Sequence, residues 1–160
     1  MSFGERFRRL AQVACTAAGL GRRDGATVAL SAGLLAWYRL RASLAGGGHR
    51  LLARELGAAG GAGAGQAEGR GQEASRLARL FHHASARPAL GGSCIPRSLA
   101  LARLLRLHGL AARVRVGLRR DGGDLAGHAW VEHHGAVLDD CEERILGFAP
   151  LRVARGTDAE

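Results

Sequence analysis

The chain has 160 residues, enough for one modest domain, and its 47% hydrophobic content with only 4% aromatic residues predicts a core of leucine, alanine and valine. The net charge is +9, but all 23 basic residues are arginine and no nucleic-acid-binding motif accompanies them, which argues against a dedicated nucleic-acid function. The three cysteines form no CxxC pair, and their odd number argues against a disulfide framework.

Residues 1–56 are predicted to form a helical segment. Apolar side chains recur at roughly helical spacing over residues 5–20 and 26–45, and a short helix is expected over 49–56. The first apolar run imitates a secretory signal, but Glu5 and the polar residues that interrupt the run argue against one. The second run is too short to span a bilayer. We therefore expect a cytoplasmic protein, with peripheral membrane contact left open.

A stretch rich in glycine and alanine follows at residues 57–72, and it has no periodic apolar face. This composition predicts a flexible linker. An amphipathic helix is expected over residues 73–85. We therefore expect the core domain to occupy residues 73–152, with a short C-terminal tail at 153–160.

Cys94 opens the next predicted helix, which extends to His108 and carries leucines on much of its circumference. Pro96 suits the first turn of a helix, and Gly109 is well placed to end it in a left-handed conformation. A cysteine at a helix N-terminus suits a nucleophile, because unpaired backbone N–H groups and the helix dipole favour the thiolate. The alternative is a buried, inert thiol that packs as a small hydrophobic residue.

Three strands are predicted after this helix. Residues 112–118 alternate apolar side chains with arginines, residues 121–124 form a turn signal, and residues 126–133 and 136–139 follow as strands. A helix followed by an antiparallel meander predicts an α+β fold. In such a fold the nucleophile lies on the helix and its partners lie on the sheet.

His128 lies on the second predicted strand, with Trp130 and Glu132 on the same face by period-two spacing. It can accept the thiol proton and later give a proton to a leaving amine, although an isolated histidine is often structural. Asp140, beyond it, is our candidate for orienting the imidazole. It competes with Asp139, because adjacent strand residues point to opposite faces.

The hypothesis is therefore a triad of Cys94, His128 and Asp140. Other potential metal ligands lie close to this group in the sequence, but none has the spacing of a zinc site, so we expect neither metal nor cofactor. The remaining histidine pairs and cysteines are interpreted as solvent-exposed (His82–His83 and His133–His134) or structural (Cys15 and Cys141).

Several short segments of the second half occur together in a known family. They are Cys94-Ile-Pro-Arg-Ser-Leu, Arg113-Val-Arg-Val-Gly117, His128-Ala-Trp-Val-Glu132, Gly135 and Asp140. In these segments the chain resembles the transglutaminase-like cysteine peptidases of bacterial lasso-peptide biosynthesis, the leader peptidases of the microcin-processing type. The resemblance is strong over residues 76–152 and weak over residues 24–56.

The resemblance implies an enzyme that cuts the leader from a ribosomally synthesised precursor. A separate ATP-dependent, asparagine-synthetase-like cyclase then joins the exposed amine to an Asp or Glu side chain. By position, Cys94 would be the nucleophile, His128 the base and Asp140 the orienting acid. Residues 1–75 lack the alternating strands of the leader-binding domain that some members carry, so we expect a separate leader-recognition protein. The alternatives are a transglutaminase-like acyltransferase and a non-catalytic basic scaffold in a biosynthetic complex.

Overall fold

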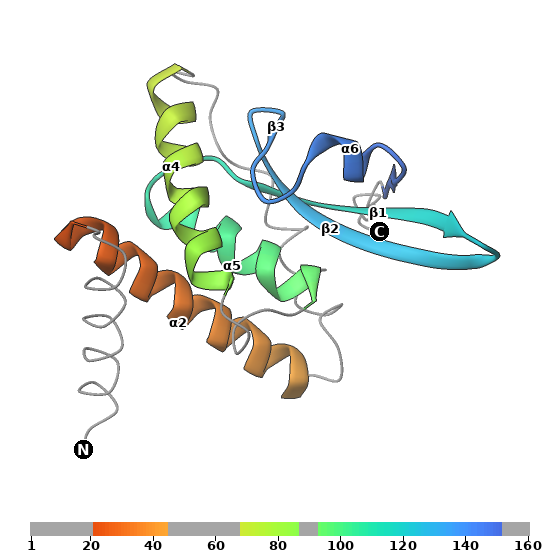
Figure 1. The fold of residues 1–160 in the computed structure, drawn as a ribbon, viewed down its shortest axis with the longest axis horizontal. Helices are drawn as coiled ribbons and strands as arrows, with labels where there is room; N and C mark the ends of the chain where they lie inside the picture. The colour runs from red at the N-terminus through yellow and green to blue at the C-terminus, as the bar shows by residue number, and fades with distance from the viewer. Residues whose placement is uncertain (1–20, 45–67, 87–92, 152–160) are drawn as a thin grey trace, which may run out of the picture.

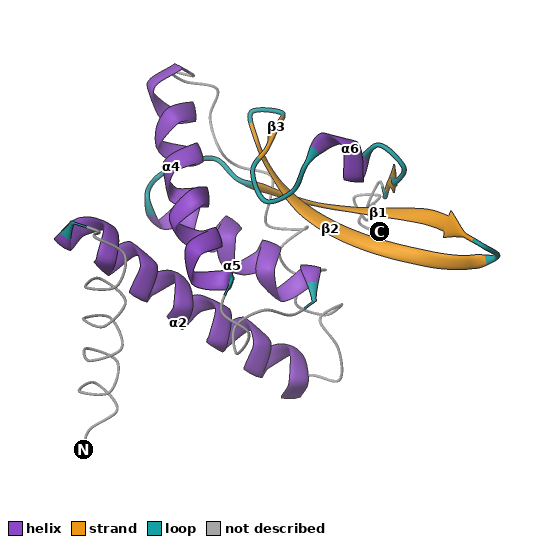
Figure 2. Ribbon diagram, in the orientation of Figure 1, coloured by secondary structure: helices purple, strands orange, loops and turns teal. Residues whose placement is uncertain are grey.

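The computed structural model describes residues 21–44, 68–86 and 93–151 (Figure 1). Within these ranges, helices precede a small antiparallel sheet, so the fold is α+β, as the sequence pattern predicted (Figure 2). The long helices are α2 (Arg22–Leu44), α4 (Glu68–Ser85) and α5 (Cys94–Leu107). Among the described helices, none has the length and apolar character needed to cross a membrane.

The sheet has the strand order β3–β2–β1–β4, and every neighbouring pair is antiparallel. Strands β1 (Arg113–Asp121) and β2 (Asp124–His133) form a long hairpin. Strand β3 (Ala136–Val137) pairs with β2, and β4 (Ala149–Pro150) pairs with β1. The connection from β3 to β4 contains α6 (Glu142–Ile145) and passes from one edge of the hairpin to the other.

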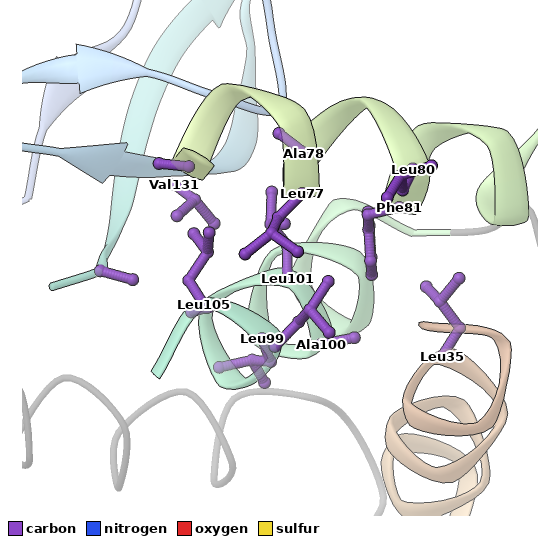
Figure 3. Packing of buried hydrophobic residues seen from close by; sticks show 14 of the residues in the cluster. Leu35, Leu77, Ala78, Leu80, Phe81, Leu99, Ala100, Leu101, Leu105 and Val131 are labelled. Atoms are coloured by element: carbon purple, nitrogen blue, oxygen red, sulfur yellow. The ribbon is translucent and has the colours of Figure 1, made fainter. Parts of the chain in front are cut away.

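The hydrophobic core lies where α2, α4 and α5 meet the hairpin (Figure 3). Helix α4 presents an apolar stripe at helical spacing, in which Leu77 and Phe81 are fully buried. Leu35 reaches the cluster from α2, and Val114 and Val131 reach it from the sheet. Each buried leucine or phenylalanine contributes about 2 kcal/mol of hydrophobic stabilisation.

Helix α5 is buried on most of its surface and holds the other elements together. Residues without exposed surface run through its centre: Leu99, Ala100, Leu101, Ala102, Leu104 and Leu105. At its C-terminal end, Gly109 has a φ of 71°, which ends the helix as predicted. The Arg106 guanidinium donates to the carbonyl of Ala112 at 3.1 Å, so this end lies beside the start of β1. The N-terminal part, which begins with Cys94, lies against β2, where Ser98 contacts the carbonyl oxygen of Ala129.

Tight glycine turns set the register of the sheet. Gly122 and Gly123 have positive φ values of 59° and 108°, which suits the two-residue turn between β1 and β2. His134 and Gly135 both have positive φ between β2 and β3. The register that follows places Gly117 opposite His128.

Several element boundaries differ from the sequence prediction. Helix α4 begins at Glu68, so the last residues of the predicted linker, 68–72, are helical. Strand β3 ends at Val137, so Asp139 and Asp140 follow the strand instead of belonging to it. The short elements α6 and β4 were not predicted. The helices expected over 5–20 and 49–56, and the tail at 153–160, lie outside the described residues.

Candidate active site

The structure brings together two of the three predicted site residues. Nε2 of His128 lies 2.5 Å from Oδ2 of Asp140. The Asp140 side chain is only 3% exposed and that of His128 is 16% exposed, so the contact is shielded from solvent. The other Asp140 oxygen, Oδ1, accepts the main-chain N–H of Cys141 at 2.9 Å and lies 3.6 Å from Nε of Arg144.

These contacts change the ionisation of Asp140. Burial alone would raise its pKa, but the hydrogen bonds from His128 and the Cys141 main chain, together with the Arg144 charge, outweigh burial and lower it. Asp140 is therefore an anionic acceptor at neutral pH. An imidazole that donates Nε2–H to it has Nδ1 free as its basic nitrogen.

Two aromatic rings contact the His128 imidazole on the face of the sheet that carries His128. The ring stacks on Trp130 with centroids 6.3 Å apart, and it lies 5.3 Å from the ring of Phe148 in the β3–β4 connection. Gly117 makes room for both rings, since a Cβ at this position would lie 2.7 Å from Phe148 Cβ and 3.0 Å from the Trp130 ring. The connection therefore covers the face of the hairpin that carries His128.

The expected sharing of one face by His128, Trp130 and Glu132 is confirmed. The indole Nε1 of Trp130 donates to Oε1 of Glu132 at 3.0 Å. Nε of Arg115, on the neighbouring strand, donates to Oε2 of the same carboxylate at 2.9 Å. Glu132 is thus engaged at both oxygens and fixes the plane of the indole that stacks on His128.

Cys94 is the first residue of α5 and is partly buried. The preceding Ser93 has extended backbone angles and makes no side-chain capping bond, so backbone N–H groups at the helix start are available to an anion. Within the described residues, no hydrogen bond joins Cys94 to His128. Catalytic hydrogen bonds often form only when substrate binds.

Ser98 ties the start of α5 to the strand of His128. It lies one helical turn, about 6 Å, beyond Cys94. Its hydroxyl oxygen is 3.0 Å from the carbonyl oxygen of Ala129, the residue after His128. The helix that begins with Cys94 is therefore joined to the strand of His128 one helical turn after the cysteine.

Asp139 contacts a different part of the site from Asp140. Its side chain is buried, with one oxygen accepting the N–H of Val131 at 2.6 Å and the other lying 2.8 Å from Ser98 Oγ. Burial raises its pKa, although the hydrogen bonds from Val131 and Ser98 oppose this. The sequence analysis missed the contact with Ser98, a buried serine four residues after Cys94 on α5.

Two histidines interpreted as solvent-exposed have structural partners instead. Nε2 of the partly buried His82 lies 3.2 Å from the carbonyl oxygen of Leu138. His133 is 3% exposed, and its Nδ1 lies 2.5 Å from the carbonyl oxygen of Ala111. Within residues 21–44, 68–86 and 93–151, no three His, Cys, Asp or Glu side chains gather closely enough to hold a metal ion.

A pocket of about 640 Å³ lies away from these residues. It opens between α2 and α4 at the C-terminal end of α5, where Arg23, Arg76 and His108 contribute to its wall. Since Cys94 starts the same helix, the pocket and the cysteine lie at opposite ends of α5.

The chain matches the model of the transglutaminase-like superfamily over residues 34–153. The matched stretch is well over half of the chain and includes α5, the hairpin, and the connection that carries Asp140. Neither the curated proteins nor the solved structures include a match to this chain.

Proposed function

Because the chain belongs to the transglutaminase-like superfamily, we propose that it is a cysteine peptidase that removes the leader from a ribosomally synthesised lasso-peptide precursor. The superfamily supports cysteine peptidase or acyltransferase chemistry. One observation carries the proposal, namely the contact between His128 and Asp140. The strand that bears His128 is joined through Ser98 to the helix that starts with Cys94. The choice of a lasso-peptide leader as substrate rests on the motif segments around these three residues.

In the proposed reaction, the sulfur of Cys94 attacks the carbonyl carbon of the last leader residue while Nδ1 of His128 takes the thiol proton. The negative oxygen is stabilised by the backbone N–H of Cys94 at the start of α5. His128 then protonates the departing amine, which becomes the N-terminus of the core peptide. Water attacks the thioester, releases the leader as a carboxylic acid and restores the thiol.

We further propose two protein partners. A separate leader-recognition protein presents the precursor, and an asparagine-synthetase-like cyclase uses ATP to join the new amine to an acidic side chain. The peptidase itself needs no cofactor in this proposal, because sulfur, imidazole and carboxylate supply every proton transfer. The arginine-rich surface would favour docking of an acidic leader or partner.

Mass spectrometry of a candidate precursor, incubated with this protein and a leader-binding partner, tests the proposal. Wild type should cut one bond, and Cys94→Ala should leave the precursor intact. Cys141→Ala is the matched control, since Cys141 is the other described free thiol and is exposed. Cleavage by Cys94→Ala, or its loss in Cys141→Ala alone, would contradict the assigned nucleophile.

Acyl transfer differs from hydrolysis only in the molecule that resolves the thioester. A primary amine added to the same incubation distinguishes the two. A peptidase should yield the free leader acid, whereas an acyltransferase would yield the leader amide, which is heavier than the acid by the mass of the amine less that of water. A bound precursor that undergoes neither change would favour the non-catalytic scaffold.

A further inference from the structure

The buried contact between Ser98 and Asp139 poses a problem of hydrogen counting. Ser98 Oγ lies 2.8 Å from Asp139 Oδ2 and 3.0 Å from the carbonyl oxygen of Ala129. Both Ser98 and Asp139 are buried, at 0% and 2% exposure. A hydroxyl has one hydrogen, and both a carboxylate and a carbonyl only accept. If Asp139 is ionised, one of the two contacts has no hydrogen between its oxygens.

A proton on Asp139 removes this conflict. The acid then donates from Oδ2 to Ser98 Oγ, and Ser98 donates its own hydrogen to the carbonyl of Ala129. The remaining oxygen, Oδ1, still accepts the N–H of Val131 at 2.6 Å. Every polar atom of the group then has a partner, as buried polar groups require.

We propose that Asp139, as a neutral carboxylic acid, and Ser98 are positioning residues that hold the helix of Cys94 against the strand of His128. We call this pair the Ser98–Asp139 clamp. The role given to it rests on the proposed function, because alignment of Cys94 with His128 matters only if the two react together. Asp139 itself touches neither residue and takes no part in the bond changes.

The surroundings of Asp139 set the pH range over which the clamp is complete. Burial raises its pKa, while the main-chain N–H of Val131 and the charges of Arg97 and His82 oppose this. The Ser98 hydroxyl also opposes the rise when it donates to the ionised carboxylate, but in the neutral clamp it accepts from Asp139. The guanidinium of Arg97, on α5, donates to the main-chain carbonyl of Asp139 at 2.7 Å.

Since the pKa is raised in the folded protein, the contribution of the neutral acid to stability is full below the ordinary aspartate pKa. It is lost as the pH rises through the raised value. His82 on α4, and the neighbouring Asp140 with its partner His128, are the other ionisable groups near Asp139. The experiment therefore compares wild type with a variant altered only at residue 139.

Asp139→Asn separates the neutral acid from the carboxylate. Asparagine keeps an oxygen for Val131 and offers an N–H to Ser98, so it copies the neutral acid at every pH. We expect Asp139→Asn to keep kcat within about threefold of wild type. Asp139→Ala and Ser98→Ala should lower kcat tenfold to about a hundredfold at similar KM, as a displacement near 1 Å predicts. Circular dichroism checks that each variant is folded, and a folded Asp139→Asn with kcat as low as Asp139→Ala would overturn the proposal.

Infrared spectroscopy tests the proton without any substrate. Wild type should show a protonated-carboxyl band that persists as the pH rises beyond the range in which ordinary carboxyl groups ionise, and Asp139→Asn should lack it. Denaturant unfolding should show wild type losing stability relative to Asp139→Asn as the pH rises through the same range. If both the band and this stability difference were absent, the assignment of Asp139 as a neutral carboxylic acid would be overturned. If wild type cleaves no precursor, the proposed function fails, while both measurements still decide the state of Asp139.

Discussion

Asp139 and Asp140 are adjacent in the chain, yet their carboxyl groups have different partners and opposite pKa shifts. Asp139 is buried against α5 and its pKa is raised, whereas Asp140 meets His128 and its pKa is lowered. Neighbouring carboxyl groups whose environments move their pKa values apart are suited to different tasks. In this site the anion faces the imidazole and the other carboxyl faces the helix.

Replacing Asp140 with Asn should therefore damage the chemistry most. Asparagine can present N–H to His128 and stabilise the wrong tautomer, and the analogous change in a serine protease triad lowers kcat about 10⁴-fold. We expect a loss of several orders of magnitude in kcat, measured by steady-state cleavage of the precursor. If Asp139→Asn were the crippling change and Asp140→Asn were not, the assignment of the two aspartates would have to be exchanged.

The lowered pKa of Asp140 also predicts a pH dependence of stability. A depressed folded-state pKa stabilises the protein above the ordinary aspartate pKa of 3.8, and this contribution is lost as the pH falls through the folded-state value. The stability difference between wild type and Asp140→Asn should be present near neutral pH and vanish in strong acid. Urea unfolding at both pH values measures it, and a difference that grows in acid would contradict the shift.

The sequence predicted His128 and Asp140 as partners but left Asp139 as a competitor. The two-residue alternation applies only if both aspartates are strand residues, whereas β3 ends at Val137 and both follow it in the bend before α6. Side-chain directions in such a bend depend on local backbone angles and not on a two-residue period. The two aspartates do face different partners, but the backbone angles of the bend, and not strand alternation, separate their side chains.

At the scale of elements, the close approach of the β3–β4 connection to β1 depends on Gly117. A methyl group at this position would meet backbone-proximal Phe148 Cβ at 2.7 Å and the Trp130 ring at 3.0 Å. Because both rings contact the imidazole of His128, moving them moves the base.

Gly117→Ala is therefore expected to lower kcat about tenfold or more while the hairpin remains paired, since a small displacement of a catalytic group has effects of this size. Precursor cleavage together with circular dichroism measures both properties. Gly127→Ala is the control on the neighbouring strand, because a Cβ there meets only Leu118 Cδ2 at 3.6 Å. Equal activity of Gly117→Ala and wild type would show that the connection does not position His128.

The elements that sequence analysis missed are those with weak local signals. Strand β4 has two residues and α6 has four, which are too few to show periodicity. The position of β4 is set by its pairing with β1, and α6 begins two residues after Asp140. The first turns of α4 contain Gly69 and Gly71, which disfavour helix in isolation. Packing of the α4 stripe on α2 and α5 outweighs that preference.

At the scale of the whole molecule, α5 is both the centre of the core and the support of Cys94. Leu105, in its C-terminal half, is fully buried and packs in the cluster with Val131. Leu105→Ala should cost about 3 kcal/mol of the free energy of unfolding, through lost burial and the cavity left behind.

Denaturant unfolding of Leu105→Ala, with exposed Leu107→Ala as the control, measures this cost. Leu107→Ala should change the free energy of unfolding by less than about 1 kcal/mol, as expected of a surface substitution. A comparable loss in both variants would contradict the central place of α5 in the core.

The distance between Ser98 and Cys94 gives α5 the properties of a lever whose pivot is the contact with Ala129. With a lever arm of about 6 Å, a tilt of roughly 10° at the pivot displaces the sulfur-bearing residue by about 1 Å. A misplacement of that size can cost two orders of magnitude in rate. Because the leucines of α5 beyond Ser98 fill the core, substitutions deep in the interior can change the tilt of this helix. Such substitutions can therefore alter turnover without touching the reacting atoms.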